Sequence, residues 1–213
     1  QPQFLRVGNL GADVVLNLQV VYDNVPQQLT VVAYDGVPVD TLYTSTELYL
    51  PPGGRVEFVM TSPTKAVKHA EMLTTQVNVG TVVEAEPRRT LLRFDVVDPV
   101  YAPSRRYVPA FDPKAPSLYE RARDVAATLP NVTRRLHFFE APVDPTNPNS
   151  EITFFITVQG QPEQAFNYSQ HGHPHGPRLG VTTHAGMVED WVIENWTLEE
   201  HEFHIHQLHF LVV

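Results

Sequence analysis

The residues of this chain best suited to chemistry are histidines near its end. Of the 10 His in the sequence, four fall within residues 201–213, at positions 201, 204, 206 and 209. The rest of that run is mostly apolar and β-branched or aromatic, which favours a buried strand. Because side chains alternate along a strand, His204 and His206 share one face and His201 falls on the other.

Three imidazoles at this spacing can hold metal. A pair at i, i+2 can serve one ion or two neighbouring ions, and a third His turned away can serve a separate site. Imidazole suits copper, zinc, iron or nickel. The alternative is three polar residues that only satisfy hydrogen bonds near a strand end. Three His in six residues favour metal ligation over that alternative.

The motif His201-x-x-His204-x-His206, followed by a Phe and a β-branched pair, resembles the first copper motif in the last domain of multicopper oxidases. These are laccase-like enzymes built from cupredoxin domains. The resemblance implies that His201 is a ligand of type 1 copper, His204 of type 2 copper and His206 of type 3 copper. His209 matches no ligand position.

The residues before this motif extend the resemblance. Residues 186–197 are similar to the family's Gly-x-x-Glu-x-Trp-x-x-x-Asn strand, which precedes the ligands. Gly186, Glu189, Trp191 and Asn195 occupy the matching positions. The ordered combination of this strand and the His motif is more specific than either part.

The first half of the chain resembles the middle domain of a three-domain multicopper oxidase. Residues 31–38 carry an Asp-Gly-x-Pro turn and residues 48–57 a Pro-Gly-x-Arg hairpin. Residues 4–9 resemble an Arg-containing strand that normally lies inside that domain, so its first strands are expected to be missing. Most such domains hold no copper ligand, and we expect the lone His69 to lie on the surface.

Composition limits the function. A formal net charge of −9 argues against nucleic acid or an anionic membrane surface as partner. The 19 Pro favour a loop-rich all-β protein, and no apolar run is long enough to span a membrane. The absence of Cys excludes disulfides and thiolate metal sites, whereas a blue copper site needs a Cys thiolate. We therefore expect the chain to be a fragment of a longer oxidase.

Short strands separated by Gly and Pro predict two cupredoxin-like Greek-key β-sandwich domains, both incomplete. The expected limits are 1–98 for the middle domain, 99–133 for a Pro-rich linker and 134–213 for the last domain. Strands are expected, among others, at 28–34, 55–61 and 152–159. Within the linker, residues 117–127 predict a short helix with Ser117 as N-cap.

Two further patterns carry less information. His171, His173 and His175 lie in a Gly- and Pro-rich run, which is more typical of an exposed loop with adventitious metal affinity than of a native site. Three Asn-x-Ser/Thr triplets, including the one at Asn195, match the N-glycosylation pattern and receive no weight.

The sequence therefore predicts part of a copper-dependent oxidoreductase, secreted or periplasmic by family resemblance. The parent would oxidise a small reducing substrate at type 1 copper and reduce dioxygen to water at a trinuclear copper cluster. The chain alone is expected to be inactive, with its copper sites empty or partial. Its expected partners are the remaining segments of the parent chain or another copy of itself, but neither nucleic acid nor membrane. Two alternatives stay open: a non-catalytic β-sandwich module that binds copper or zinc through His, and a purely structural sandwich.

Overall fold

The computed structural model describes residues 2–11, 13–80, 86–96, 118–147, 149–163, 181–206 and 208–213. The chain divides into two compact units, with the boundary between Glu120 and Arg121. Each unit is described by itself.

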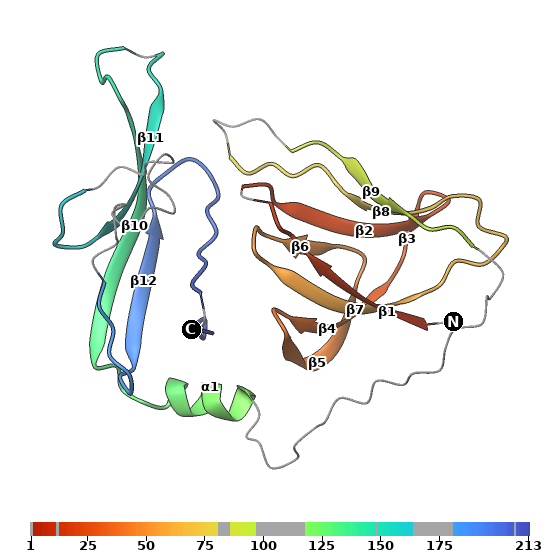
Figure 1. The fold of residues 1–213 in the computed structure, drawn as a ribbon, viewed down its shortest axis with the longest axis horizontal. Helices are drawn as coiled ribbons and strands as arrows, with labels where there is room; N and C mark the ends of the chain where they lie inside the picture. Colours follow the sequence, from red (N-terminus) through yellow and green to blue (C-terminus); the bar gives the residue numbers. More distant parts are fainter. Residues whose placement is uncertain are drawn as a thin grey trace. The chain divides into compact units, whose positions relative to one another are not determined.

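The first unit is built from two antiparallel sheets (Figure 1). Its strands are β1 (Pro2–Gly8), β2 (Leu16–Tyr22), β3 (Val25–Pro26), β4 (Leu29–Tyr34), β5 (Val37–Ser45), β6 (Leu48–Leu50), β7 (Arg55–Thr61), β8 (Ala70–Thr74) and β9 (Arg89–Arg93). One sheet has the order β1-β7-β4-β5. The other has the order β3-β2-β8-β9, with β6 also paired to β2.

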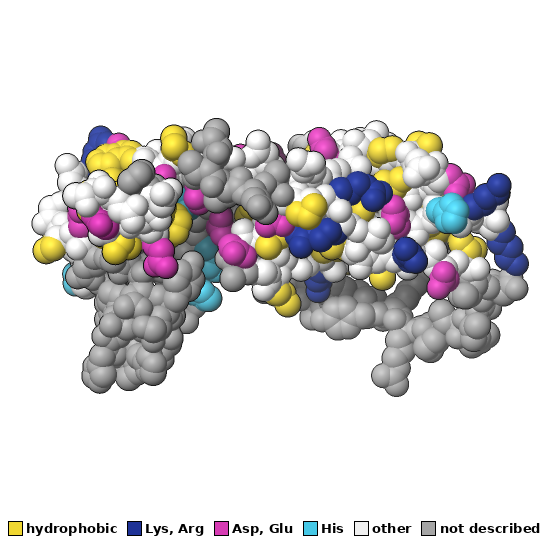
Figure 2. All heavy atoms as spheres, turned by 90° about the horizontal axis from the view of Figure 1, so that it is seen from above, with side chains coloured by type: hydrophobic (Ala, Val, Ile, Leu, Met, Phe, Trp, Pro, Cys, Tyr) yellow, Lys and Arg dark blue, Asp and Glu magenta, His cyan; other side chains and the backbone are white. Residues whose placement is uncertain are grey.

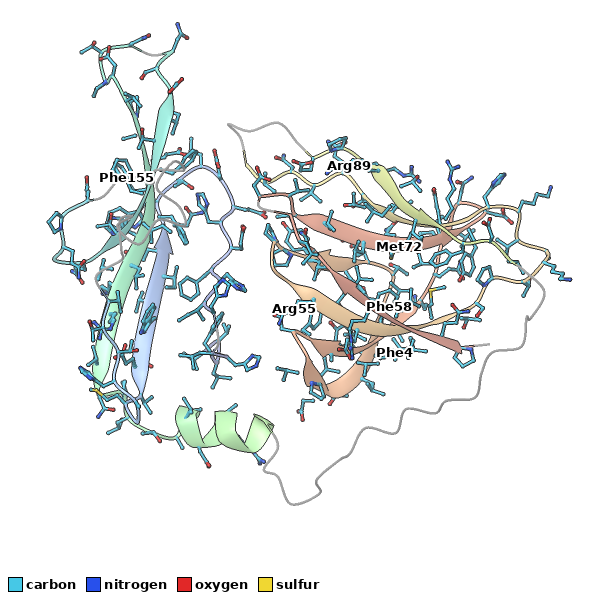
Figure 3. All side chains as sticks on the ribbon, viewed as in Figure 1. Phe4, Arg55, Phe58, Met72, Arg89 and Phe155 are labelled. Carbon is cyan, nitrogen blue, oxygen red and sulfur yellow. The ribbon has the colours of Figure 1, made fainter. Side chains whose placement is uncertain are left out.

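The core of this unit lies between the two sheets. The burial of β4 and β7 alternates residue by residue, as expected when one face of each sheet is covered. Phe58 of β7 is fully buried and belongs to the same apolar cluster as Met72 of β8, from the opposite sheet (Figure 3). The two layers form a β-sandwich of the cupredoxin-like kind that the sequence predicts.

The turn between β4 and β5 is set by Asp35-Gly36. Both residues have positive φ, 52° and 80°, which a tight two-residue hairpin turn requires and which Gly adopts without strain. The Asp35 carboxylate accepts the backbone N–H of Arg55 at 2.9 Å and pairs with its guanidinium at 3.2 Å. The Asp-Gly turn and the Pro-Gly-x-Arg hairpin recognised in the sequence are therefore in direct contact.

The second unit contains a three-stranded sheet of order β11-β10-β12. It begins within α1 (Leu118–Ala126), which crosses the boundary, and continues with β10 (Val132–Pro142), β11 (Ile152–Val158) and β12 (Glu189–Asn195). β10 and β11 pair antiparallel, whereas β10 and β12 pair parallel. In Figure 1 the chain turns after β12 and runs back beside the sheet.

The all-β fold predicted from the sequence is confirmed. The strands expected at 28–34, 55–61 and 152–159 correspond to β4, β7 and β11, and the expected helix corresponds to α1. The expected N-cap, Ser117, lies outside the described residues, as does most of the linker. The limits of the predicted domains therefore stay a prediction.

The buried strand predicted over residues 201–213 is wrong. No strand is assigned among the described residues of this run, and Phe210 and Val212 are 58% and 84% exposed. A strand requires a partner for its backbone hydrogen bonds. The strands of this sheet pair with one another, and none of the described pairings includes a residue of this run.

On the face in Figure 2, most basic side chains lie over the first unit, with acidic side chains among them. Where the structure describes the chain, it contains no helix long and apolar enough to cross a membrane.

Replacing Phe58 by Ala is expected to destabilise the first unit by about 3–5 kcal/mol, because it opens a cavity between the two sheets. Phe4→Ala is the matched control, since Phe4 is 54% exposed on β1, and it should cost about 1 kcal/mol or less. Amide hydrogen exchange of β2 and β8 measures both. Equal protection losses in the two variants would contradict this description of the core.

Candidate metal centre

One face of the second sheet carries the residues that position the histidines. In parallel pairing, residues in register lie side by side and point to the same side of the sheet. Arg134 pairs with Trp191, Leu136 with Ile193, and Phe138 with Asn195. We call the face formed by these three pairs, together with Glu189, the front face. Leu136 is 2% exposed and marks its covered centre.

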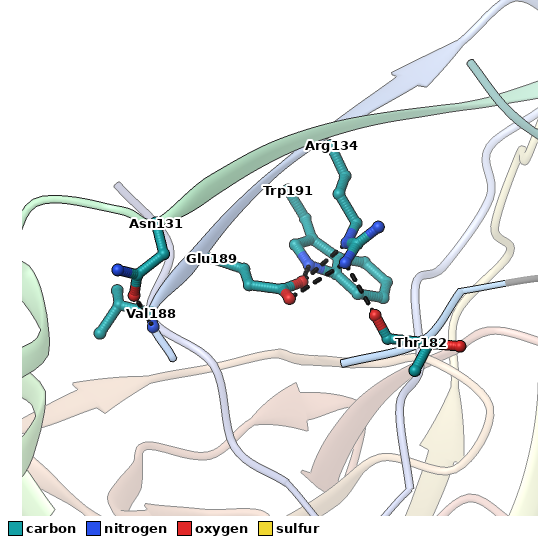
Figure 4. Close-up of polar contacts among 6 residues, drawn as sticks. All are labelled: Asn131, Arg134, Thr182, Val188, Glu189 and Trp191. Atoms are coloured by element: carbon teal, nitrogen blue, oxygen red, sulfur yellow. Dashed lines mark hydrogen bonds and ion pairs between the residues drawn. The ribbon is translucent and has the colours of Figure 1, made fainter. Parts of the chain in front are cut away.

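At the start of β12 the front face carries an ion pair (Figure 4). The Glu189 carboxylate pairs with Arg134 through two bonds, from Nε at 2.8 Å and from Nη2 at 3.1 Å. It also accepts the indole N–H of Trp191 at 2.9 Å, and Arg134 donates to the carbonyl of Thr182 at 2.8 Å. A two-point Arg–carboxylate contact fixes direction as well as distance, so this cluster sets how β12 lies against β10.

The same contacts perturb the acidity of Glu189. Its hydrogen bonds to Arg134 and then to Trp191 lower the pKa from the ordinary value of 4.5 to about 2. The carboxyl side chain is 9% exposed and that of Arg134 is 22% exposed. The pair is thus shielded from solvent and stays ionised over the physiological range.

A tight turn precedes β12. Gly186 has φ of 86°, in the left-handed region that side chains other than Gly rarely adopt. Just beyond it, the backbone N–H of Val188 donates to the Asn131 side chain at 2.9 Å, and the N–H of Asn131 donates to the carbonyl of Val188 at 2.7 Å. These two bonds fix the start of β12 beside the start of β10.

The segment after β12 contacts the front face through aromatic rings. The ring of His201 stacks on Phe138, with centroids 4.9 Å apart and planes 17° apart. Phe203 lies 6.1 Å from Trp191 and 5.6 Å from Phe210, centroid to centroid. Although it is not a strand, this segment is held by ring contacts along the sheet.

The candidate ligands fall into two groups. The rings of His204 and His206 lie 4.8 Å apart at an interplanar angle of 85°, and both side chains are exposed. His201 is partly buried, and its Nε2 lies 2.9 Å from the hydroxyl oxygen of Thr197. His204 and His206 are thus brought together, whereas His201 has Phe138 and Thr197 as neighbours.

These donors fit copper in type and fall short of a complete centre. Neutral imidazole is a good copper ligand. Within the described residues, however, no group of three or more His, Cys, Asp or Glu is placed to hold a metal ion. The chain offers a partial donor set, and the remaining ligands of any centre would have to come from outside the described residues. The run containing His171, His173 and His175 also lies outside them.

The sequence pattern identified Glu189, Trp191 and Asn195 without their partners. The pattern assigns no role to Arg134, Phe138 or Thr197. Arg134 is 55 positions from Glu189 in the chain, and a contact at that separation leaves no local pattern. Thr197 did carry a signal, because Asn-x-Thr favours a side-chain turn over the next residues.

Comparison with known proteins gives structural likeness only. No family model matches the sequence, and no curated protein matches it. Among solved structures, a multicopper oxidase from Campylobacter jejuni, described as a metallo-oxidase, superposes with a TM-score of 0.55 at 17% identity. The match covers 90% of this chain and 36% of that one, so the chain spans about a third of its length.

A second similar structure is a variant of the McoA multicopper oxidase from the hyperthermophile Aquifex aeolicus. Its TM-score is 0.47 at 13% identity, over 76% of this chain and 31% of that one. The superposition on the Campylobacter jejuni enzyme confirms the recognised resemblance at the level of fold: the chain folds like part of a multicopper oxidase.

Glu189→Gln is expected to lower the stability of the second unit, because it removes the charge that Arg134 binds. The pKa of Glu189 is lowered on folding, so its stabilisation is present above about pH 4.5 and is lost as the pH falls toward about 2. The difference between wild type and variant should therefore shrink over that window. Both Trp lie in the second unit, so thermal unfolding followed by Trp fluorescence measures it.

The matched control is Glu194→Gln on the same strand. Glu194 pairs with Arg135 at 3.0 Å, with side chains 35% and 51% exposed, and exposed pairs contribute little. A variant at position 194 as unstable as the one at position 189, or a difference at position 189 that persists unchanged at pH 2, would show that the Arg134–Glu189 pair does not hold the sheet.

Proposed function

We propose that this chain is part of a multicopper oxidase and supplies three of its copper ligands. His201 ligates type 1 copper, where a small reducing substrate gives up electrons. His204 ligates type 2 copper and His206 type 3 copper of the trinuclear cluster, where dioxygen is reduced to water. The bound copper supplies the one-electron chemistry, and the protein supplies and orients the imidazoles.

The grouping of the histidines carries this proposal. Two exposed imidazoles, those of His204 and His206, lie together with 4.8 Å between ring centroids. The third, His201, is held against the front face by Phe138. A trinuclear cluster and a separate mononuclear site need the ligands to be divided in this way. A single site with three His ligands would instead need all three imidazoles together. The sequence order of the motif and the fold likeness to multicopper oxidases support the same assignment.

The front face explains how such ligands are held in place. The Arg134–Glu189 pair aligns β10 with β12, and Phe138 and Asn195, a register pair in these strands, lie at the end where the His segment begins. His201 itself lies outside the strands, and its contact with Phe138 connects it to the rigid sheet. The proposal includes the secreted or periplasmic location that the resemblance implies. It also includes an oxidoreductase activity, which requires the rest of the oxidase.

Copper titration of the 213-residue chain tests the His204–His206 pair. All proteins compared should carry Ala at positions 171, 173 and 175, to remove that run of His as a competing ligand. His204→Ala and His206→Ala should each weaken Cu(II) binding by about tenfold or more, because each removes a direct ligand. His209→Ala is the matched control, since His209 is also exposed, and should change affinity less than about twofold.

The same titration distinguishes part of a multicopper oxidase from a non-catalytic metal-binding module. The chain has no Cys, so the copper-bound protein should lack intense blue absorption and consume no dioxygen with a phenolic reductant. Unchanged copper affinity at positions 204 and 206 would overturn the ligand assignment. Zinc binding tighter than copper binding at these positions would instead favour the non-catalytic module.

In an oxidase that contains this segment, the three ligands should give different losses. His204→Ala or His206→Ala should deplete the trinuclear cluster and stop dioxygen reduction while the blue colour remains. His201→Ala should remove the blue colour. Each effect should exceed the ~10–100-fold change typical of residues that only support a ligand. Absorption spectra and copper content measure this, and loss of the colour on replacing His206 would contradict the division of roles.

A further inference from the structure

We propose that Thr197 is a positioning residue that fixes His201 in the tautomer with its proton on Nε2, so that Nδ1 presents the free lone pair. This inference rests on the proposed function and adds the residue that orients the imidazole of His201. It is carried by the hydrogen bonds of the turn that follows β12.

The turn is closed by the Asn195 side chain. Its Oδ1 accepts the backbone N–H of Thr197 at 3.0 Å and lies 2.8 Å from the Thr197 hydroxyl oxygen. Its Nδ2 donates to the carbonyl of Glu199 at 2.6 Å. Because the amide nitrogen donates there, the oxygen that faces Thr197 is an acceptor only.

The Thr197 hydroxyl has one proton and two lone pairs, and each has a defined use. Its oxygen accepts the backbone N–H of Glu199 at 3.2 Å. Its proton faces two acceptors that cannot donate, Asn195 Oδ1 at 2.8 Å and the Glu199 carbonyl at 3.2 Å. If the proton pointed to His201 instead, these oxygens would face each other without a hydrogen between them.

The remaining lone pair of Thr197 therefore accepts from His201. The distance from His201 Nε2 to the hydroxyl oxygen is 2.9 Å, typical of an N–H···O bond. A neutral imidazole carries one N–H, so a proton on Nε2 leaves Nδ1 as the acceptor.

Phe138 and Thr197 constrain His201 in complementary ways. The stack on Phe138, at 17° between planes, fixes the plane of the imidazole. A half-turn of the ring about its Cβ–Cγ bond would leave the imidazole in the same plane. It would place a carbon where Nε2 now lies and would lose the bond to Thr197. The hydrogen bond thus selects one of two ring orientations that the stack allows.

A contact of this kind matters for a metal ligand. Ligand imidazoles usually donate their second N–H to a neighbouring acceptor, which sets the tautomer and the ring direction. Here that acceptor is in place in the chain itself, ahead of any ion. His204 and His206 lie in a different group, so the device concerns the site assigned to His201 alone.

Nuclear magnetic resonance of the metal-free, ¹⁵N-His-labelled 213-residue chain tests this inference. The spectra should be recorded at about pH 8, so that imidazoles are compared in the neutral form. The His201 signal is assigned by its loss in His201→Gln. In wild type and Thr197→Ser, which keeps the hydroxyl, His201 should show only the Nε2–H tautomer with a visible Nε2 proton.

In Thr197→Val, which keeps the shape and removes the hydroxyl, the Nε2 proton should exchange about tenfold faster, the effect of losing one hydrogen bond. The Nδ1–H tautomer should also appear. His137, stacked on Trp196 at 3.8 Å, serves as an internal reference for folding. An Nδ1–H majority in wild type would overturn the inference without any variant. A Thr197→Val spectrum equal to wild type would overturn it as well.

The outcomes of this test and of the copper titration distinguish a failure of the Thr197 inference from a failure of the proposed function. A Thr197 effect without copper loss at positions 204 and 206 would leave the ring contact standing and remove the proposed function. Copper loss at those positions with a wrong His201 tautomer would remove only the present inference. Should Thr197→Val not fold, Thr197→Ala provides the comparison without the hydroxyl, and an Nδ1–H majority in wild type would still overturn the inference.

Discussion

The second unit depends on one shielded carboxylate. Glu189 begins β12, and its two bonds to Arg134 fix the lateral position of a strand that enters the sheet parallel to β10. A parallel neighbour is reached only through a long connection, here the residues between β11 and β12, so no tight turn sets its register. The ion pair and the Asn131–Val188 bonds take over that task.

Once β12 is in register, the two faces of the sheet acquire different chemistry. The front face combines the ion pair, the buried Leu136 and the ring of Phe138 that meets His201. The opposite face carries the exposed Arg135–Glu194 pair and the stack of His137 on Trp196. A slip of β12 by one residue against β10 would turn the β12 side chains of each set to the other face. It would turn Glu189 away from Arg134 and Asn195 away from the front face, so the ion pair at one end of β12 also controls the turn that leads to His201 at the other.

The sequence predicts those features of the second unit that depend on residues close together in the chain. The Gly186 turn, the β12 strand and its Asn each have a reason within a few residues: a positive φ, alternation, and a side-chain turn. Arg134 has no such reason, because its contact with Glu189 joins distant segments. The failed strand over 201–213 shows the same limit. Its composition suits a strand, yet composition cannot supply a hydrogen-bonding partner, and none of the described pairings provides one.

The Asn195-Trp196-Thr197 triplet has a structural role in the folded chain that is separate from its match to the glycosylation pattern. Asn195 Nδ2 donates to the carbonyl of Glu199 at 2.6 Å. The Thr197 hydroxyl, the other essential part of the pattern, is likewise committed to Asn195 and to His201. The same residues that match the modification pattern are thus the ones that close the turn and orient the histidine.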